Sequence, residues 1–152
     1  MCQASDLSLA TDDENGSFNG MSHSGTLLIL RNLSSTPCRL PARPEITFRD
    51  GTKPLDVKLE IAGAKHMHPG PVLVPVVIVP DAEVTSKLRW ISGEVYDDTL
   101  CLTPTAVAVR IGKEVQQAAM GAHICGERAK GVAFEAMPFT TDPTYEGWKK
   151  AH

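Results

Sequence analysis

The sequence has few aromatic residues, no strong excess of charge of either sign and no long apolar run. Phe, Trp and Tyr make up 5% of its 152 residues, and its formal net charge is −3 at pH 7. A nucleic-acid partner needs a clustered basic face, so we expect none. The longest apolar stretch, residues 72–79, is interrupted by Pro75 and is too short to cross a bilayer. This argues against an integral membrane protein.

Recognisable enzyme motifs are also absent from the sequence. It has no G-x-S-x-G, no H-E-x-x-H and no phosphate-binding glycine loop. Asp97 and Asp98 are adjacent, and neighbours on a strand point to opposite faces, so shared acid–base catalysis is not expected. We expect a protein that is not an enzyme; a hydrolase with an unrecognised site is a weaker alternative. No secretory signal peptide is visible, and we expect Met1 to be an initiator placed before a mature or truncated chain.

The four cysteines are widely separated, at Cys2, Cys38, Cys101 and Cys125. None belongs to a C-x-x-C pair, which argues against a zinc ribbon or a thioredoxin-like site. An even number of cysteines in a chain with 12 glycines and 11 prolines indicates structural disulfides and an oxidising compartment. Spacing alone leaves three pairings open. The alternative is four buried free thiols in a cytosolic domain.

Hydrophobic residues alternate with polar ones over many short segments, which predicts strands. Residues 26–30 form a continuous apolar run, as in a central strand covered on both faces. The only helix signal, residues 112–120, is weak and is equally consistent with a strand and its loop. We therefore predict an all-β antiparallel sandwich of about seven to nine strands. Its predicted core comprises Leu28, Leu30, Phe48, Leu88, Trp90, Val107 and Val109.

The chain shows no internal repeat and no linker that would divide it. We predict one sandwich domain over residues 1–139, with residues 140–152 as a tail that packs on it or frays. The polar stretch from Asp12 to Gly20 lacks the ordered spacing of a calcium loop, so we interpret it as a solvated loop.

Four segments of the sequence resemble a known family. They are residues 2–9, the Asn32 turn followed by Pro37-Cys38-Arg39-Leu40 and residues 44–48, the Leu88-Arg89-Trp90 strand, and Cys101 with residues 106–109 and 125–126. Together they resemble family 4232 of domains of unknown function, which are exported or lipid-anchored bacterial proteins. The resemblance implies an immunoglobulin-like sandwich and a periplasmic or secreted location, and it implies no activity.

The resemblance also implies how the cysteines pair: Cys2 with Cys38, and Cys101 with Cys125. A minor alternative is that Cys2 carries a lipid anchor at the mature N-terminus. That alternative leaves Cys38 unpaired, which is unfavourable in an oxidising compartment.

The one constellation above background is His66-Met67-His68, with His23 and Met21 in another loop and Met120 and His123 ahead of Cys125. Imidazoles and thioethers suit copper, so we consider a soft metal site at His66, Met67 and His68, helped by His23 or Met21. The alternative is that they are exposed loop residues and methionines that fill gaps, with no cofactor bound. Trp90 is similarly better explained as core than as a ligand-stacking residue.

Two functions of different classes follow. The first is an exported, non-catalytic binding or structural module of the bacterial cell envelope, whose partner is an unidentified envelope protein or surface component. The second is a periplasmic protein that binds copper or another soft metal through its His and Met loops.

Overall fold

The computed structural model describes residues 1–13, 19–20, 22–60 and 73–141. These residues form strands and one short 3₁₀ turn, η1 (Ala4–Asp6). The strands are β1 (Leu7–Asp12), β2 (His23–Asn32), β3 (Cys38–Leu40), β4 (Glu45–Asp50), β5 (Lys53–Pro54), β6 (Val57–Glu60), β7 (Val76–Ile78), β8 (Glu83–Ile91), β9 (Thr99–Leu102), β10 (Ala106–Ile111), β11 (Glu114–Ala119), β12 (Ile124–Glu127) and β13 (Val132–Ala136).

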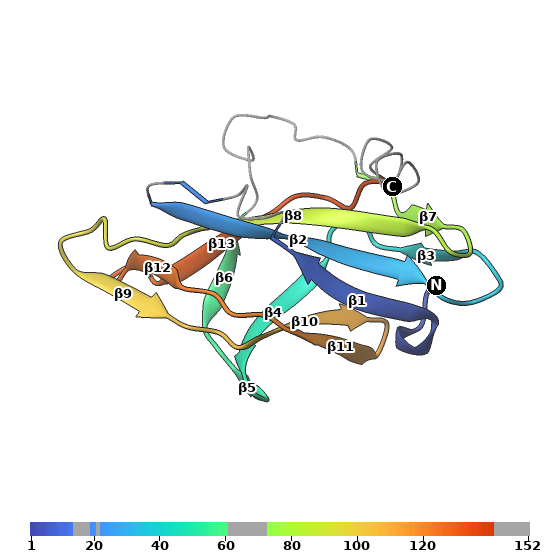
Figure 1. Ribbon diagram of the computed structural model, residues 1–152, viewed down its shortest axis with the longest axis horizontal. Helices are drawn as coiled ribbons and strands as arrows, with labels where there is room; N and C mark the ends of the chain where they lie inside the picture. The colour runs from blue at the N-terminus through green and yellow to red at the C-terminus, as the bar shows by residue number, and fades with distance from the viewer. Residues whose placement is uncertain (14–18, 21, 61–72, 142–152) are drawn as a thin grey trace.

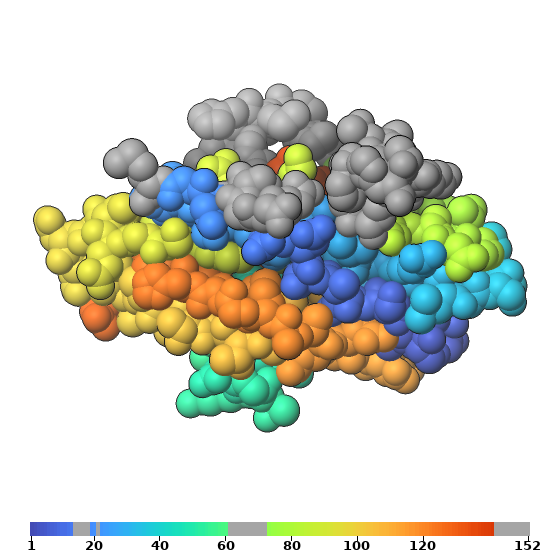
Figure 2. All heavy atoms as spheres, in the orientation of Figure 1, coloured from blue at the N-terminus to red at the C-terminus, as the bar shows by residue number. Residues whose placement is uncertain are grey.

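The strands form two main sheets that face each other (Figure 1). The larger sheet has the order β1-β2-β8-β12-β9, and β13 joins it by pairing with both β8 and β6. The smaller sheet has the order β11-β10-β4-β5, and β3 and β7 form a separate two-stranded sheet. The β5 end of the smaller sheet projects from the body of the molecule (Figure 2). The predicted all-β antiparallel sandwich is thereby confirmed.

β2 and β8 form the centre of the larger sheet. They pair antiparallel from His23 opposite Ile91 to Arg31 opposite Glu83. The run from Gly25 to Leu30 is buried throughout, as the continuous apolar pattern predicts for a strand covered on both faces. β8 alternates from Ser86 onward, where Ser86, Leu88 and Trp90 are buried and Lys87 and Arg89 are exposed, while Val84 and Thr85 are both buried.

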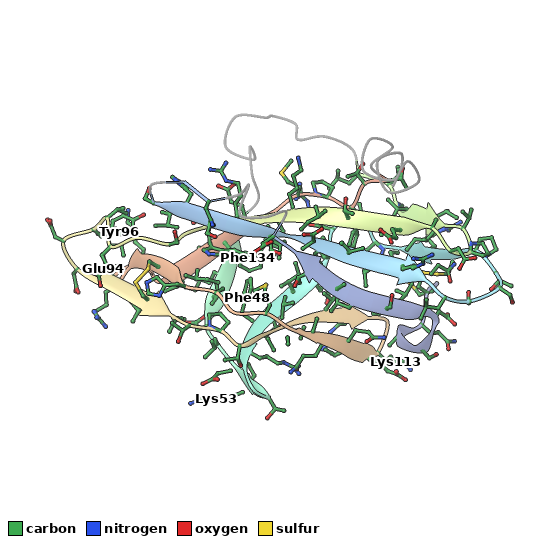
Figure 3. All side chains as sticks on the ribbon, viewed as in Figure 1. Phe48, Lys53, Glu94, Tyr96, Lys113 and Phe134 are labelled. Atoms are coloured by element: carbon green, nitrogen blue, oxygen red, sulfur yellow. A yellow bond between two sulfur atoms is a disulfide. The ribbon has the colours of Figure 1, made fainter. Side chains whose placement is uncertain are left out.

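The core lies between the two sheets and is centred on Phe48 of β4. The Phe48 ring packs edge-to-face against Phe134 of β13, with ring centroids 4.9 Å apart, and against Trp90 of β8 at 5.9 Å. Figure 3 shows Phe48 and Phe134 pointing toward each other across the interior. The predicted core residues Leu28, Leu30, Phe48, Leu88, Trp90, Val107 and Val109 are all buried.

Both predicted disulfides are confirmed. Cys2 is bonded to Cys38 and Cys101 to Cys125, and among the described residues no cysteine is free. The bridged residues are separated by 36 and 24 positions, so each bridge is worth about 3–4 kcal/mol in the chain-entropy model. Because the Cys2 sulfur forms a disulfide, it is not available for a lipid thioether.

The predicted number of strands was too low, because the described part of the chain contains thirteen. Three of the extra strands, β3, β5 and β7, are two- and three-residue segments that are too short to show a periodic pattern. One pair, β6 with β13, is parallel, which departs from a purely antiparallel sandwich. The ambiguous segment at residues 112–120 contains the strand β11 and no helix.

The end of the sandwich domain runs beside β8. Thr140 and Thr85 exchange backbone hydrogen bonds of 2.9 Å, and the Ser86 hydroxyl donates to the Met137 carbonyl at 2.6 Å. The predicted tail lies almost entirely outside the described residues, which end at residue 141. No helix among the described residues combines the length and apolarity needed to cross a membrane.

Asn32 at the end of β2 organises the turn that leads to Cys38. Its side chain is fully buried and donates to the carbonyl oxygens of Thr36 at 2.9 Å and Ile78 at 2.8 Å. Its carbonyl oxygen accepts from the Ser34 amide at 2.9 Å and from the Ser34 hydroxyl at 2.7 Å. One side chain therefore joins β2, the turn and β7 and helps to place Cys38 opposite Cys2.

Replacing Asn32 by Ala should destabilise the protein by about 2–3 kcal/mol or more, because the carbonyl oxygen of buried Ile78 loses the Asn32 donor and the Ser34 amide loses its acceptor. Ser34→Ala is the matched control. It removes one hydroxyl near the surface and should cost only about 1 kcal/mol. Urea unfolding of both variants measures the difference, and equal losses of stability would contradict the role given to Asn32.

Gly126 allows the chain to reverse tightly between β12 and β13. A β-carbon at Gly126 would lie 2.5 Å from the carbonyl oxygen of Gly131 and 2.9 Å from the α-carbon of Val132. Both are backbone atoms that cannot move independently of the sheet. The close approach keeps Cys125, which precedes Gly126, in register with Cys101.

Gly126→Ala should therefore lower stability by about 1–3 kcal/mol, since the added methyl group overpacks the turn. Gly121→Ala is the control, because a β-carbon there meets no atom within 4 Å. Thermal unfolding should separate the two variants. If the two variants have the same melting temperature, the chain reversal at Gly126 tolerates a side chain.

Candidate functional site

A cleft of about 630 Å³ opens where the start of β2 meets the end of β8. It is bounded by the end of β1, by residues 19–20, by β2, by Trp90 and Ser92, and by the connection from β11 to β12. Its side chains include two carboxylates, at Asp12 and Asp13, two imidazoles, at His23 and His123, and the thioether of Met120, which follows β11. We call it the His23–His123 cleft.

Backbone hydrogen bonds fix the side of this cleft where His23 lies. The Ser92 amide donates to the Ser22 carbonyl at 2.8 Å, and the Gly20 amide donates to the His23 carbonyl at 2.9 Å. The hydroxyl of Ser24 donates to the Asn19 side-chain oxygen at 2.6 Å. These contacts extend the β2–β8 pairing beyond the strands, so the exposed His23 side chain projects from an anchored segment.

Trp90 forms part of the floor of the cleft. The side chain is 6% exposed, and its indole nitrogen is buried without a hydrogen-bond acceptor among the described residues. Burial of an unpaired donor costs free energy, and such groups in native proteins call for an explanation. The prediction that Trp90 is a core residue is confirmed, and the same residue also lines the cleft.

A second cleft of about 720 Å³ lies on the other side of Trp90. It is lined by β6, by the end of β8 and by β12 and β13, with His23, Tyr96 and Cys125 among its residues. Its charged side chains have both signs, as with Lys58 and Glu135. Because side chains of both charges line it, this cleft favours neither anionic nor cationic ligands.

The predicted metal ligands fall into two groups. His66, Met67, His68 and Met21 lie outside the described residues, so their proposed convergence with His23 stays a prediction. His23 is exposed, and its imidazole contacts the neighbouring Ser22 hydroxyl at 3.3 Å. The structure brings His23 to the same cleft as Met120 and His123, which follow β11.

Sequence reasoning missed a tighter cluster around the second disulfide. The ligand atoms of Cys101, His123 and Cys125 all lie within 4.8 Å of one another. Cys101 of β9 pairs directly with Cys125 of β12, and His123 lies two residues before Cys125, so its side chain projects on the same face. The His-x-Cys spacing of His123 and Cys125, together with the Cys101–Cys125 pairing, was the signal that could have revealed it.

Burial differs across this cluster. Cys125 is buried, Cys101 is half-buried and His123 is exposed. In the disulfide state the two sulfurs are bonded to each other, so only the His123 imidazole is free to act as a metal ligand or as an acid or base.

Asp98, one of the two adjacent aspartates, forms an ion pair with Arg128. Its carboxylate accepts a hydrogen bond of 3.0 Å from the Arg128 guanidinium, and both side chains are more than half exposed. The Arg128 amide also donates to the Asp98 carbonyl at 3.0 Å. The pair ties the segment before β9 to the turn after β12 and contributes about 0–1 kcal/mol.

The comparisons with known proteins give one match. The model of a domain of unknown function, DUF4232, matches residues 2–141. No curated protein and no solved structure matches the chain. The family match covers the sandwich, both disulfides and the His23–His123 cleft, and it assigns no activity. The chain belongs to the DUF4232 family of domains of unknown function.

Proposed function

We propose that this protein is a non-catalytic binding module that works outside the cytoplasm, in the bacterial cell envelope, and that the His23–His123 cleft is its ligand site. The observation that carries the proposal is the cleft itself, where segments from β1, β2, β8 and the β11–β12 connection converge. Ligand sites typically occupy such concave regions with a few convergent polar groups.

The two disulfides support the location outside the cytoplasm. All four cysteines are used in bridges between segments far apart in the sequence. Structural disulfides persist in oxidising compartments and are rare where thioredoxin and glutathione keep thiols reduced.

The geometry at His23 favours binding over hydrolysis. A Ser–His nucleophile pair needs a hydrogen bond of about 2.6–3.2 Å and a third group that orients the base. Ser22 and His23 are sequence neighbours, and their side chains are 3.3 Å apart. Both are partners in an exposed contact at the start of β2, which is a poor setting for activating a nucleophile.

A second candidate function, binding of copper or another soft metal, is favoured by one specific observation. His23, Met120 and His123 come from two distant parts of the chain and line the same cleft. Imidazole and thioether are ligands of copper. This cleft is therefore a candidate metal site beside the predicted one at His66, Met67 and His68, which lies outside the described residues.

The first test concerns the compartment. Protein purified from its native cells without reductant, after thiols are blocked with iodoacetamide, should carry no alkylated cysteine. Its mass should be lower than that of the reduced chain by the hydrogens of two disulfides. Intact-mass spectrometry measures both quantities. Alkylation at all four cysteines would place the native protein in a reducing compartment and contradict the proposed location.

The second test uses Trp90 as a reporter of the cleft. In a Trp148→Phe variant, Trp90 is the remaining tryptophan, and paramagnetic Cu(II) bound in the cleft should quench its fluorescence. Adding His23→Ala and His123→Ala should abolish saturable quenching. Quenching should also weaken in acid, because a protonated imidazole cannot bind a metal. A fluorescence titration of the oxidised protein measures both effects.

The matched control is the double variant His66→Ala and His68→Ala in the same Trp148→Phe background. It removes no side chain among the described residues that line the cleft, so saturable quenching should persist. Loss of quenching in this control with retention in the His23/His123 variant would assign copper to the other loop. Absence of quenching in every protein would contradict the metal-binding function. Only the proposal of a non-catalytic binding module would then remain.

A further inference from the structure

The Cys101–Cys125 bridge differs from a disulfide that only reinforces a core. One of its sulfurs belongs to a half-buried residue on β9, and an exposed imidazole lies beside it. β9 pairs with β12 alone among the described strands, so it forms an edge of the larger sheet. Figure 2 shows the yellow and orange residues around β9 and β12 at the surface of one end of the molecule.

From this arrangement we infer that Cys101, Cys125 and His123 form a redox-gated metal site. The oxidised protein holds the disulfide and no ion there. The reduced protein presents two thiolates and one imidazole, a donor set for a thiophilic ion such as Zn(II). This inference goes beyond the proposed function and does not rest on it, because the sulfur ligands exist only after reduction.

Strand pairing holds the donors in place once the sulfur–sulfur bond is broken. Four consecutive pairs, from Ile124 opposite Leu102 to Glu127 opposite Thr99, join β9 and β12 independently of the bridge. Beyond one end, the Ala122 amide donates to the Pro104 carbonyl at 3.3 Å. Beyond the other end, Arg128 binds Asp98. The reduced cysteines therefore stay opposite each other.

The distances suit a zinc ion. Tetrahedral zinc with Zn–S bonds of about 2.3 Å and Zn–N bonds of about 2.0–2.1 Å separates its ligand atoms by about 3.5–3.8 Å. The ligand atoms of Cys101, His123 and Cys125 already lie within 4.8 Å of one another. The two sulfurs are bonded to each other in the oxidised protein, so after reduction their side chains rotate apart to admit the ion. Because His123 is exposed, a fourth position remains open to water.

An external dithiol can supply the two electrons of the reduction. A thiolate of the reductant attacks the Cys101 sulfur, which belongs to the more exposed partner, and the Cys125 sulfur leaves as a thiolate. The second thiol of the reductant then resolves the mixed disulfide. The net change is two electrons and two protons transferred to the protein and one disulfide formed in the reductant. Zn(II) binding afterwards releases the two thiol protons.

The test measures zinc affinity by competition with a chromophoric chelator, in the full-length protein reduced by a phosphine under anaerobic conditions. Co(II) serves as the spectroscopic probe, because Co(II)–thiolate bonds give a charge-transfer band. The Cys2→Ser/Cys38→Ser variant should bind one Zn(II) per chain when reduced and none at this site when oxidised. The Cys101→Ser/Cys125→Ser variant should show no Co(II)–thiolate band.

The imidazole is tested by replacing His123 and, as a control, His152, a histidine that belongs to neither proposed site. In the reduced protein, His123→Asn should weaken zinc binding roughly tenfold or more, since loss of a ligand costs at least as much as loss of a supporting group. His152→Asn should leave the affinity unchanged. Circular dichroism monitors the β-sheet in each sample.

Three results would overturn the inference. The first is a folded, reduced Cys2→Ser/Cys38→Ser protein without a Co(II)–thiolate band. The second is equal zinc affinity in His123→Asn and His152→Asn. The third is a reduced chain that has lost its β-sheet signal, because the site depends on the paired strands. The copper titration uses the oxidised protein, which has no thiolates. Failure of the copper proposal and failure of the zinc proposal are therefore distinguishable.

Discussion

The edge-to-face packing of Phe48 against Phe134 and Trp90 is the contact on which the two sheets depend. Phe48 lies on β4 of the smaller sheet, and its two aromatic partners lie on adjacent strands of the larger one. With aromatics making up 5% of the sequence, these rings supply much of the large apolar area in the interior. The same contact fixes Trp90 at the floor of the cleft, so inter-sheet packing and site geometry share one residue.

Much of this fold could be predicted from the sequence, because burial on one face imposes a period of two on a strand. Val107 and Val109 of β10 were identified in this way, Leu28 and Leu30 of β2 were identified from a continuous apolar run, and all four are buried. The pattern gives no signal where strands are short, and it misleads where a strand such as β6 is exposed on both faces. Leu59 of β6 follows the alternation yet is 41% exposed, and the parallel pairing of β6 with β13 leaves no local signature.

The candidate site was less predictable, since it depends on how distant segments approach. His23 was identified from ligand chemistry, but its companions in the cleft follow from the β2–β8 register and from the path of the chain after β11. Likewise, His123 becomes a neighbour of Cys101 only because β12 pairs with β9 in a particular register. A shift of one residue would place the imidazole on the opposite face.

The bridge between Cys2 and Cys38 also determines how the protein responds to tension. It closes a covalent loop that contains η1, β1 and β2. A force applied at the N-terminus passes through the sulfur atoms directly to β3 and cannot peel β1 from β2. The residues between the two cysteines therefore add nothing to the extensible length of the chain, and under load the domain yields first at strands outside this loop.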